Sequence, residues 1–266
     1  MHVRTSMSVW LLAVLVSAPA EARQSDWEVN IAPPYLWASE LTGQLDVRDA
    51  TVPVFMDFAD AVDHLSGVFT FHGDARKGRF GVLADVSIVG LSTESSLTIP
   101  GLLPSAPPRT ASSHVELSNT IVEAAATYSV LPSHALSILG GMRAYTLAPT
   151  MAVSTGEGQL APVDTSETAA AAIVGVLFRP RLGQRVWLIT RGDIGGGSGF
   201  TWSGTAGVQV ELWRRTSLLL GYRALGVRAG TVNTAATATA DGDRAIAFNM
   251  THYGPAMAFN LRFGGR

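Results

Sequence analysis

Cysteine is absent from the 266 residues, so neither disulfide bonds nor thiolate metal ligands contribute to the fold or its chemistry. Charged residues are also scarce, at 15% of the chain against about 25% in soluble proteins. The formal net charge is only −2, which offers no attraction for nucleic acid. Beyond the N-terminal segment no run of about 18 apolar residues is uninterrupted, and this excludes membrane-spanning helices.

The first 22 residues have the three parts of a secretory signal peptide. Arg4 gives a positive start, residues 7–16 are apolar, and residues 18–20 or 20–22 supply small residues for cleavage. The apolar run is too short to cross a bilayer core of about 30 Å as a helix. We therefore expect residues 1–22 to be removed and residues 23–266 to be exported as one domain.

The exported part alternates between apolar and polar residues, which is typical of β-strands. In the first such segment Trp27, Val29 and Ile31 share one face, and the alternation continues to Trp37. Ten segments follow this pattern, with boundaries uncertain by about 2–4 residues: 27–37, 67–76, 79–91, 115–129, 136–147, 168–179, 185–195, 200–213, 217–228 and 246–263. The prediction is an all-β chain forming a single antiparallel transmembrane β-barrel of about ten strands, with eight or twelve as alternatives.

The connections between these segments alternate between short and long. Short ones are 77–78, 131–135, 180–184 and 214–216, and 196–199 is a tight exception in the other set. Long ones are 38–66, 92–114, 148–167 and 229–245. Outer-membrane barrels have short periplasmic turns and longer extracellular loops, so we expect the four long stretches to be extracellular loops.

The polar face of the strands indicates which side meets lipid. In residues 201–211 this face consists of Thr, Ser, Gly and Gln with a single Glu, whereas a face exposed to water normally carries more charge. The opposite faces are bulky and aromatic, as in residues 80–88 and 253–263. We therefore expect the apolar faces to meet lipid, with a soluble periplasmic β-barrel binding protein as the alternative. The aromatic residues expected at the membrane interfaces are Trp27, Trp37, Trp202, Tyr222 and Tyr253.

Several short motifs resemble those of a widespread group of poorly characterised Gram-negative outer-membrane β-barrel proteins. They lie at residues 34–37 (PYLW), 57–60 (DFAD), 75–81 (ARKGRFG), 191–196 (RGDIGG) and 221–223 (GYR). The resemblance covers nearly the whole exported part. It implies an outer-membrane location, contact with outer-membrane lipids, and assembly by the outer-membrane assembly machinery, without a known substrate.

If the apolar faces meet lipid, the charged side chains of the strands converge in the lumen. The acids are Glu28, Asp74, Asp85, Glu123, Asp193 and Glu211, and the bases are Arg76, Arg143, Arg191, Arg223 and Arg262. Because enclosed charges must be paired, the near balance favours a network of ion pairs. Two readings remain open: a narrow conduit for ions or small solutes that selects by charge, and an ion-paired filling that only holds the barrel together.

One segment departs from the alternating pattern of the strands. Residues 55–65 have apolar residues at helical spacing, so we expect a short amphipathic helix there. Its Asp57, Asp60, Asp63 and His64 could bind a divalent cation, but the spacing matches no known ligand loop, and we predict a docked helix without a metal.

Catalysis is not expected, because no histidine lies beside a serine and an acid in a position close to lipid. The glycine-rich segment 195–199 lacks the lysine of a phosphate loop, and we expect no cofactor. The sequence thus predicts an outer-membrane barrel that is either a narrow channel or a structural and surface-interaction protein. A lipid-modifying enzyme is the least favoured alternative.

Overall fold

The computed structural model describes residues 27–47, 50–99, 109–155, 158–159, 163–164, 166–229 and 246–264. Its elements are β1 (Glu28–Ala32), β2 (Tyr35–Trp37), β3 (Glu40–Val47), β4 (Ala50–Met56), α1 (Phe58–Asp63), β5 (Leu65–Lys77), β6 (Phe80–Ile99), β7 (Arg109–Ser129), β8 (Leu136–Thr155), β9 (Gly158–Gln159), β10 (Val163–Asp164), β11 (Glu167–Phe178), β12 (Val186–Gly197), β13 (Gly199–Trp213), β14 (Thr216–Ala229) and β15 (Ile246–Gly264). The expected signal peptide, residues 1–22, lies outside the described residues.

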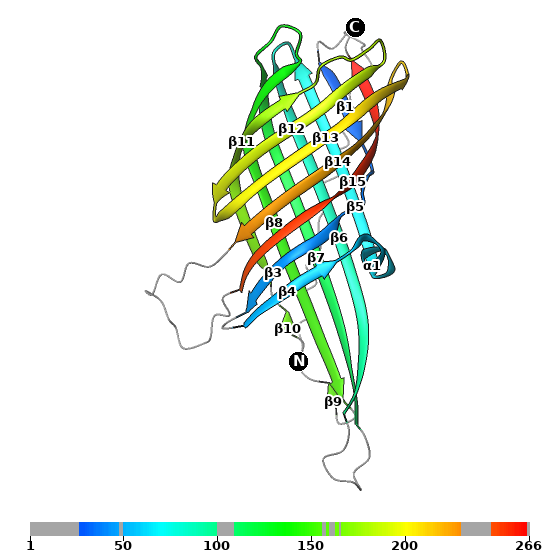
Figure 1. Ribbon diagram of the computed structural model, residues 1–266, viewed down its shortest axis with the longest axis vertical. Coiled ribbons are helices and arrows are strands. Elements are labelled where there is room, and N and C mark those ends of the chain that lie inside the picture. Colours follow the sequence, from blue (N-terminus) through cyan, green and yellow to red (C-terminus); the bar gives the residue numbers. More distant parts are fainter. Residues whose placement is uncertain are drawn as a thin grey trace, which may run out of the picture.

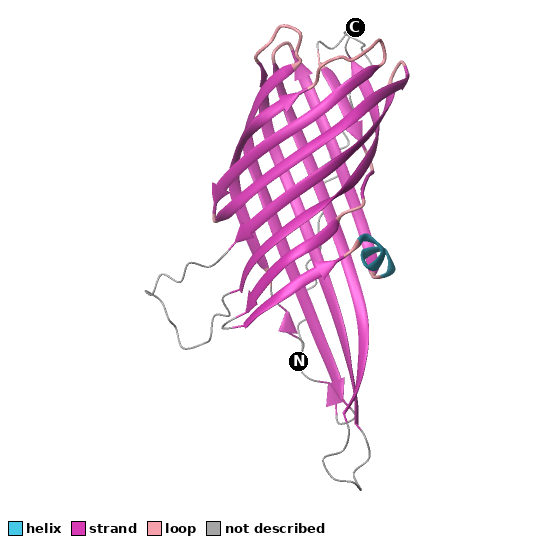
Figure 2. Cartoon of the chain, in the orientation of Figure 1, coloured by secondary structure: helices cyan, strands magenta, loops and turns pink. Residues whose placement is uncertain are grey.

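The strands form one closed antiparallel barrel (Figures 1 and 2). Around the wall the order is β1-β5-β6-β7-β8-β11-β12-β13-β14-β15, and β1 closes the ring by pairing with β15 from Glu28↔Gly264 to Ile31↔Leu261. The prediction of a ten-stranded antiparallel barrel is confirmed. Among the described residues, no helix is long and apolar enough to cross a membrane.

The two ends of the barrel differ, as the lengths of the connections predicted. The short turns lie at the upper end in Figure 1, where Gly78 takes a positive φ of 58° between β5 and β6. At the lower end β6, β7 and β8 extend beyond the rest of the wall. Because outer-membrane barrels keep their short turns in the periplasm, we take the upper end as periplasmic and the lower end as extracellular.

The stretches predicted as long loops contain much more strand than expected. Residues 38–66 include β3, β4 and α1, with β3 and β4 paired from Leu41↔Met56 to Val47↔Ala50. Residues 92–114 continue the β6–β7 ladder as far as Ile99↔Arg109, and residues 148–167 include the end of β8 with β9 and β10. Strict alternation disappears there because only a segment inside the bilayer needs one face toward lipid, whereas backbone pairing continues without it. Apart from Ala229, the stretch 229–245 lies outside the described residues.

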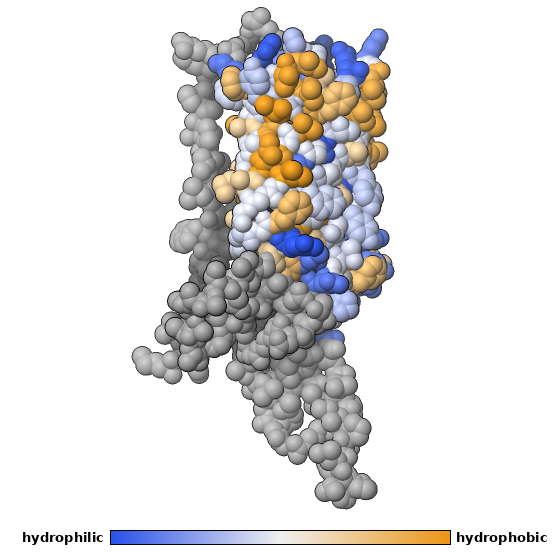
Figure 3. All heavy atoms as spheres, turned by 60° about the vertical axis from the view of Figure 1, so that its left-hand side comes forward, coloured by the Kyte–Doolittle hydropathy of each residue, from blue (hydrophilic) through white to orange (hydrophobic). Residues whose placement is uncertain are grey.

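The outer wall carries the apolar side chains. Phe80, Val82, Val176 and Leu220 are exposed, while the alternating positions of the same strands are buried or partly buried. In Figure 3 hydrophobic side chains gather on the upper part of the outer wall, and hydrophilic ones lie at the periplasmic rim and again lower on the wall. This arrangement is the one predicted for a lipid-facing barrel and the reverse of a soluble one.

One β-bulge changes the face of the first strand. β1 pairs with β15 in the register Ile31↔Leu261, but β2 pairs as Tyr35↔Ala258, so the chain gains one residue around Pro33 and Pro34. A one-residue insertion moves every following side chain to the other face. Tyr35 is therefore buried inside the barrel, and Leu36 points outward.

The bulge corrects the interpretation of Trp37. The sequence placed Trp37 on the lipid face, but its ring packs inside the barrel against the buried apolar residues of the lumen. The prediction assumed that the alternation continues across Pro33 and Pro34, and this put Trp37 on the wrong face. Two adjacent prolines lack the N–H groups that a regular ladder needs. Trp27, Trp202 and Tyr222 are exposed, as expected of outward side chains.

The outward orientation predicts how the barrel responds to charge. Val174→Arg and Leu220→Arg, which alter exposed positions away from the ends of β11 and β14, should each lower the free energy of unfolding by about 2–4 kcal/mol, because they place a guanidinium in hydrocarbon. Urea unfolding of the barrel in phospholipid vesicles measures this loss. Leu182→Arg, equally exposed but in a periplasmic turn, is the control and should change stability by less than about 0.5 kcal/mol. Equal effects at all three positions would contradict the orientation.

Candidate functional site in the barrel lumen

A group of buried and partly buried charges lies at mid-height in the lumen. Arg143 on β8 donates to Glu123 on β7 with 2.7 Å between Nη2 and Oε2, and to Asp193 on β12 with 2.8 Å between Nη2 and Oδ1. Arg191 on β12 completes the group by pairing with both acids. The Glu123 and Asp193 side chains are 0% exposed, so their charges depend wholly on these partners.

The strand register explains why these side chains meet. Glu123 and Arg143 are direct cross-strand partners on β7 and β8, and Asp193 faces Ser203 across β12 and β13. Ser203 and Thr201 add hydroxyls: Ser203 donates to Asp193 at 2.9 Å, and Arg143 donates to Thr201 at 3.1 Å. The polar atoms are thus satisfied, as a low-dielectric interior requires.

A second group of charges lies beside the first. Arg223 on β14 donates to Asp85 on β6 and to the Tyr35 hydroxyl, at 3.1 and 2.9 Å. The Tyr35 hydroxyl also donates to Asp85, and the His72 imidazole lies 3.1 Å from the same carboxylate. The Arg223 guanidinium stands over the Trp37 ring, 4.7 Å from its centre, which adds a cation–π contact.

Together these residues form what we call the central charged layer: Glu123, Arg143, Arg191, Asp193, Asp85, Arg223, Tyr35 and His72. Several of its bonds join strands that are not neighbours in the wall, such as β6 with β14 and β8 with β12. Such bonds cross the lumen instead of running along the wall. The layer therefore connects different parts of the wall through its interior.

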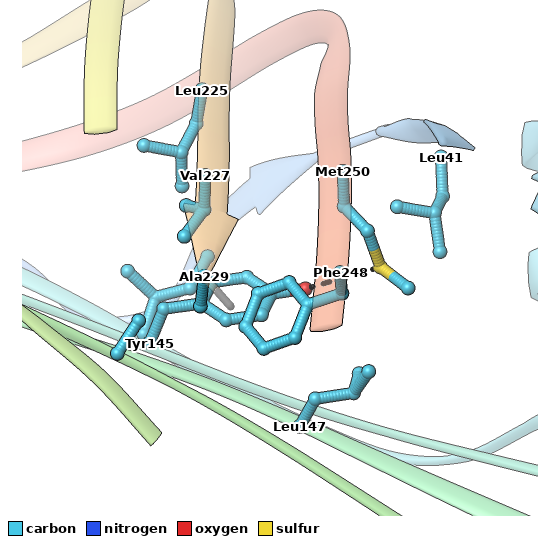
Figure 4. Close-up of a cluster of buried hydrophobic side chains, with 10 residues drawn as sticks. Leu41, Tyr145, Leu147, Leu225, Val227, Ala229, Phe248 and Met250 are labelled. Atoms are coloured by element: carbon cyan, nitrogen blue, oxygen red, sulfur yellow. Dashed lines mark hydrogen bonds between the residues drawn. The ribbon is translucent and has the colours of Figure 1, made fainter. Parts of the chain in front are cut away.

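The extracellular half of the lumen is apolar. Its buried residues, which we call the apolar layer, are Leu41, Ile121, Tyr145, Leu147, Ala169, Leu225, Val227, Ala229, Phe248 and Met250. Figure 4 shows the rings of Tyr145 from β8 and Phe248 from β15 lying together at its centre, 5.4 Å apart. At its edge the Tyr145 hydroxyl and the Asn119 amide meet the His252 imidazole, at 3.0 and 3.2 Å.

The periplasmic half of the lumen contains a cavity of about 420 Å³. Its floor includes Asp85, Arg191 and Arg223 of the central charged layer, and its rim reaches the turn residues Ser133 and His134. Further pairs stand along its wall: Arg76 with Glu28, Arg179 with Asp74 at 3.6 Å, and Arg262 with Glu211 at 3.7 Å.

The structure places all eleven charged residues predicted for the lumen, Arg76 with its partner Glu28 among them, inside the barrel. Glu123, Arg143, Asp193 and Arg191 meet in one group, and Asp85 and Arg223 in the other. Glu28, Asp74, Glu211 and Arg262 lie along the cavity. Sequence reasoning missed Tyr35, Trp37, His72 and Arg179; the adjacent prolines at 33 and 34 were the available signal for the first two.

The short helix forms where helical spacing predicted it. Asp57 caps α1 by accepting from the Asp60 backbone N–H at 2.8 Å, and His64 Nδ1 bonds the Asp60 carbonyl at 2.8 Å. These bonds use the carboxylate and the imidazole for local structure. Within the described ranges no group of three or more His, Asp or Glu side chains is arranged to hold a metal ion.

Several solved structures are similar to this chain. The outer-membrane protease OmpT of Escherichia coli has a TM-score of 0.47 and 8% identity, covering 89% of this chain and 97% of that one. The translocator domain of the autotransporter NalP of Neisseria meningitidis has a TM-score of 0.43 and 10% identity, covering 89% of this chain and 88% of that one. Ail, the attachment invasion locus protein of Yersinia pestis, has a TM-score of 0.36 and 9% identity, covering 88% of this chain and 99% of that one. No protein-family model and no curated protein matches the sequence. The likeness concerns the fold alone.

Orientation decides the class of the protein. The wall is closed, its outer face is apolar, and the enclosed charges are paired. The protein is an outer-membrane β-barrel. This excludes the soluble periplasmic barrel, which would need its apolar side chains inside and its charges outside.

The central charged layer predicts an asymmetry between buried and peripheral pairs. Glu123→Ala should lower the free energy of unfolding by about 3–5 kcal/mol, because it leaves Arg143 and Arg191 without one of their two acids. Glu211→Ala is the matched control: its pair with Arg262 is partly exposed, so the loss should stay below about 1 kcal/mol. Urea unfolding in vesicles measures both, and similar small losses would show that the layer is hydrated.

Proposed function

We propose that this outer-membrane barrel has a closed lumen and acts as a structural and surface-interaction protein instead of as an ion channel. The observation that carries the proposal is the central charged layer, whose side chains bond to one another across the lumen. An ion crossing at this height would have to displace buried partners such as Arg143 and Glu123, which are at most 1% exposed. Breaking one such pair costs several kcal/mol.

The apolar layer supports the same conclusion. It lies on the extracellular side of the charges, and its aromatic rings from β8 and β15 pack across the barrel (Figure 4). Apolar constrictions exclude water, and an ion cannot pass where its hydration shell is lost without replacement. Two successive barriers of different chemistry thus oppose conduction.

The extracellular end supports a role at the cell surface. The β6–β7 ladder continues from Leu91↔Leu117 to Ile99↔Arg109, beyond the last pair of β5 with β6 at Leu65↔Leu91. Within the described part of the chain, β4 pairs with β3 alone, and β5 before Thr70, whose hydroxyl bonds the Tyr35 backbone, pairs with β6 alone. Free strand edges can add a strand from a partner, so this end offers a surface for protein recognition.

The histidine environments favour a role without catalysis. A lipid-modifying enzyme would need a nucleophile beside an imidazole, at a position that lipid can reach. His72 bonds Asp85, and His252 meets Tyr145 and Asn119, both inside the lumen. These contacts hold both imidazoles among the packed side chains of the lumen.

Planar-bilayer recording tests whether the lumen is closed. The refolded protein should give no discrete conductance steps, whereas a sixteen-stranded porin inserted in the same way should give them. Heat-dependent mobility in gel electrophoresis verifies that the barrel has folded. Reproducible steps from the wild type, altered in ion selectivity by Arg191→Gln, would overturn the proposal in favour of the narrow channel.

The location of the protruding strands is tested separately. Because the chain has no cysteine, one introduced thiol is the only thiol present. On intact cells Glu94→Cys on the β6 extension should react with a membrane-impermeant maleimide, and Ser133→Cys in a short turn should react only after lysis. The opposite pattern would show that the strand extensions face the periplasm, and the surface role would fail.

A further inference from the structure

The periplasmic cavity has features that a merely structural barrel does not need. Its volume of about 420 Å³ lies within the range of small-molecule sites, about 300–1,000 Å³. It reaches the periplasmic turns at Ser133, His134 and Arg215, and ends at Asp85 and Arg223 of the central charged layer. The cavity is therefore open toward the periplasm and closed toward the cell exterior.

Part of the cavity wall is apolar. Leu177 on β11, Ile189 on β12 and Leu219 on β14 point into the lumen and line the cavity, with Trp187 beside them. Other inward positions of the cavity wall are small or polar, as at Ser203 and Thr205 on β13 and Ser217 on β14. Aliphatic and aromatic walls favour the apolar part of a ligand over water.

The rim of the cavity is rich in arginine. Four guanidinium groups, from Arg76, Arg179, Arg215 and Arg262, face three carboxylates, from Glu28, Asp74 and Glu211, which leaves one excess positive charge (4 − 3 = 1). Arg76 is bonded to Glu28, but Arg179 and Arg262 lie 3.6 and 3.7 Å from their acids, longer than a hydrogen bond, and Arg262 Nη2 donates to the Arg214 carbonyl at 3.0 Å.

A second observation concerns the Nε atom of Arg179. Its Nε is shielded from solvent and has no hydrogen-bond partner, although it belongs to a charged group in the cavity wall. A buried donor without an acceptor is costly. A carboxylate at this position would accept from Arg179 and satisfy it by a charge-assisted bond.

We propose that the cavity binds a small amphipathic carboxylic acid that enters from the periplasm. Its apolar body lies against Leu177, Ile189 and Leu219, and its carboxylate meets Arg179 and Arg262 near the rim. The central charged layer forms the floor and stops the ligand from passing on. This site goes beyond the proposed function, since a closed lumen could equally exist without any ligand.

Calorimetric titration of the protein in lipid nanodiscs tests the site, with 6-phenylhexanoate as the probe and empty nanodiscs as the blank. The wild type should bind one equivalent of the acid, and 6-phenylhexanamide, the neutral counterpart, should bind at least tenfold more weakly. The double variant Arg179→Gln, Arg262→Gln should weaken binding of the acid at least tenfold and leave binding of the amide unchanged. Arg185→Gln, at the same end of the barrel but outside the cavity lining, is the matched control and should bind as the wild type does.

A second variant separates the cavity from general charge effects. Thr205→Phe fills the cavity from its β13 wall and should abolish binding of both acid and amide, with Ala256→Phe as the substitute if the first variant does not fold. The proposal would be overturned if the wild-type protein gave the same heats of titration as empty nanodiscs. It would also be overturned if Arg185→Gln lost as much affinity for the acid as the double variant does. Neither result affects the conductance test, so failure of this site and failure of the closed lumen are distinguishable.

Discussion

The enclosed ion pairs of the lumen are the constraint on which the rest of the structure depends. A barrel with an apolar outer wall must turn its charged side chains inward, and there each charge needs a partner because water is scarce. Arg143 meets this need by bonding Glu123 and Asp193 at once, and Arg223 by bonding Asp85 and Tyr35. Since the bonds of Arg143 to Asp193 and of Arg223 to Asp85 join strands that are not neighbours, pairing the charges also fills the lumen.

The order of the lumen contents along the barrel axis follows from this layer. On its extracellular side the walls carry the apolar layer, and on its periplasmic side they leave a cavity with an aliphatic wall and an arginine-rich rim. The two sides differ because the central charged layer separates them. A barrel of ten strands is narrow enough for side chains to fill it, which a porin of sixteen to eighteen strands is not. Closure in the middle and accessibility from one end are therefore compatible.

Much of the fold could be predicted from the sequence. Period-two alternation gave the number of strands, and the charges on the inward face gave the members of the network, since the lipid face tolerates none of them. The pairing partners could not be predicted, because bonds such as Arg223 to Asp85 depend on wall curvature and on which strands face each other. Trp37 was placed on the wrong face because a bulge at Pro33 and Pro34 moved the register by one residue. The β3–β4 hairpin was missed because strands beyond the bilayer need no apolar face.

A double-mutant cycle between Glu123 and Arg143, measured by urea unfolding in lipid vesicles, tests the central claim most directly. If the pair is dehydrated, Glu123→Gln and Arg143→Met should each be costly alone, while the double variant should be far less destabilised than their sum, with a coupling energy of about 2–3 kcal/mol. Additive effects, with a coupling energy below about 0.5 kcal/mol, would mean that water screens the two charges and that the lumen is open at this height.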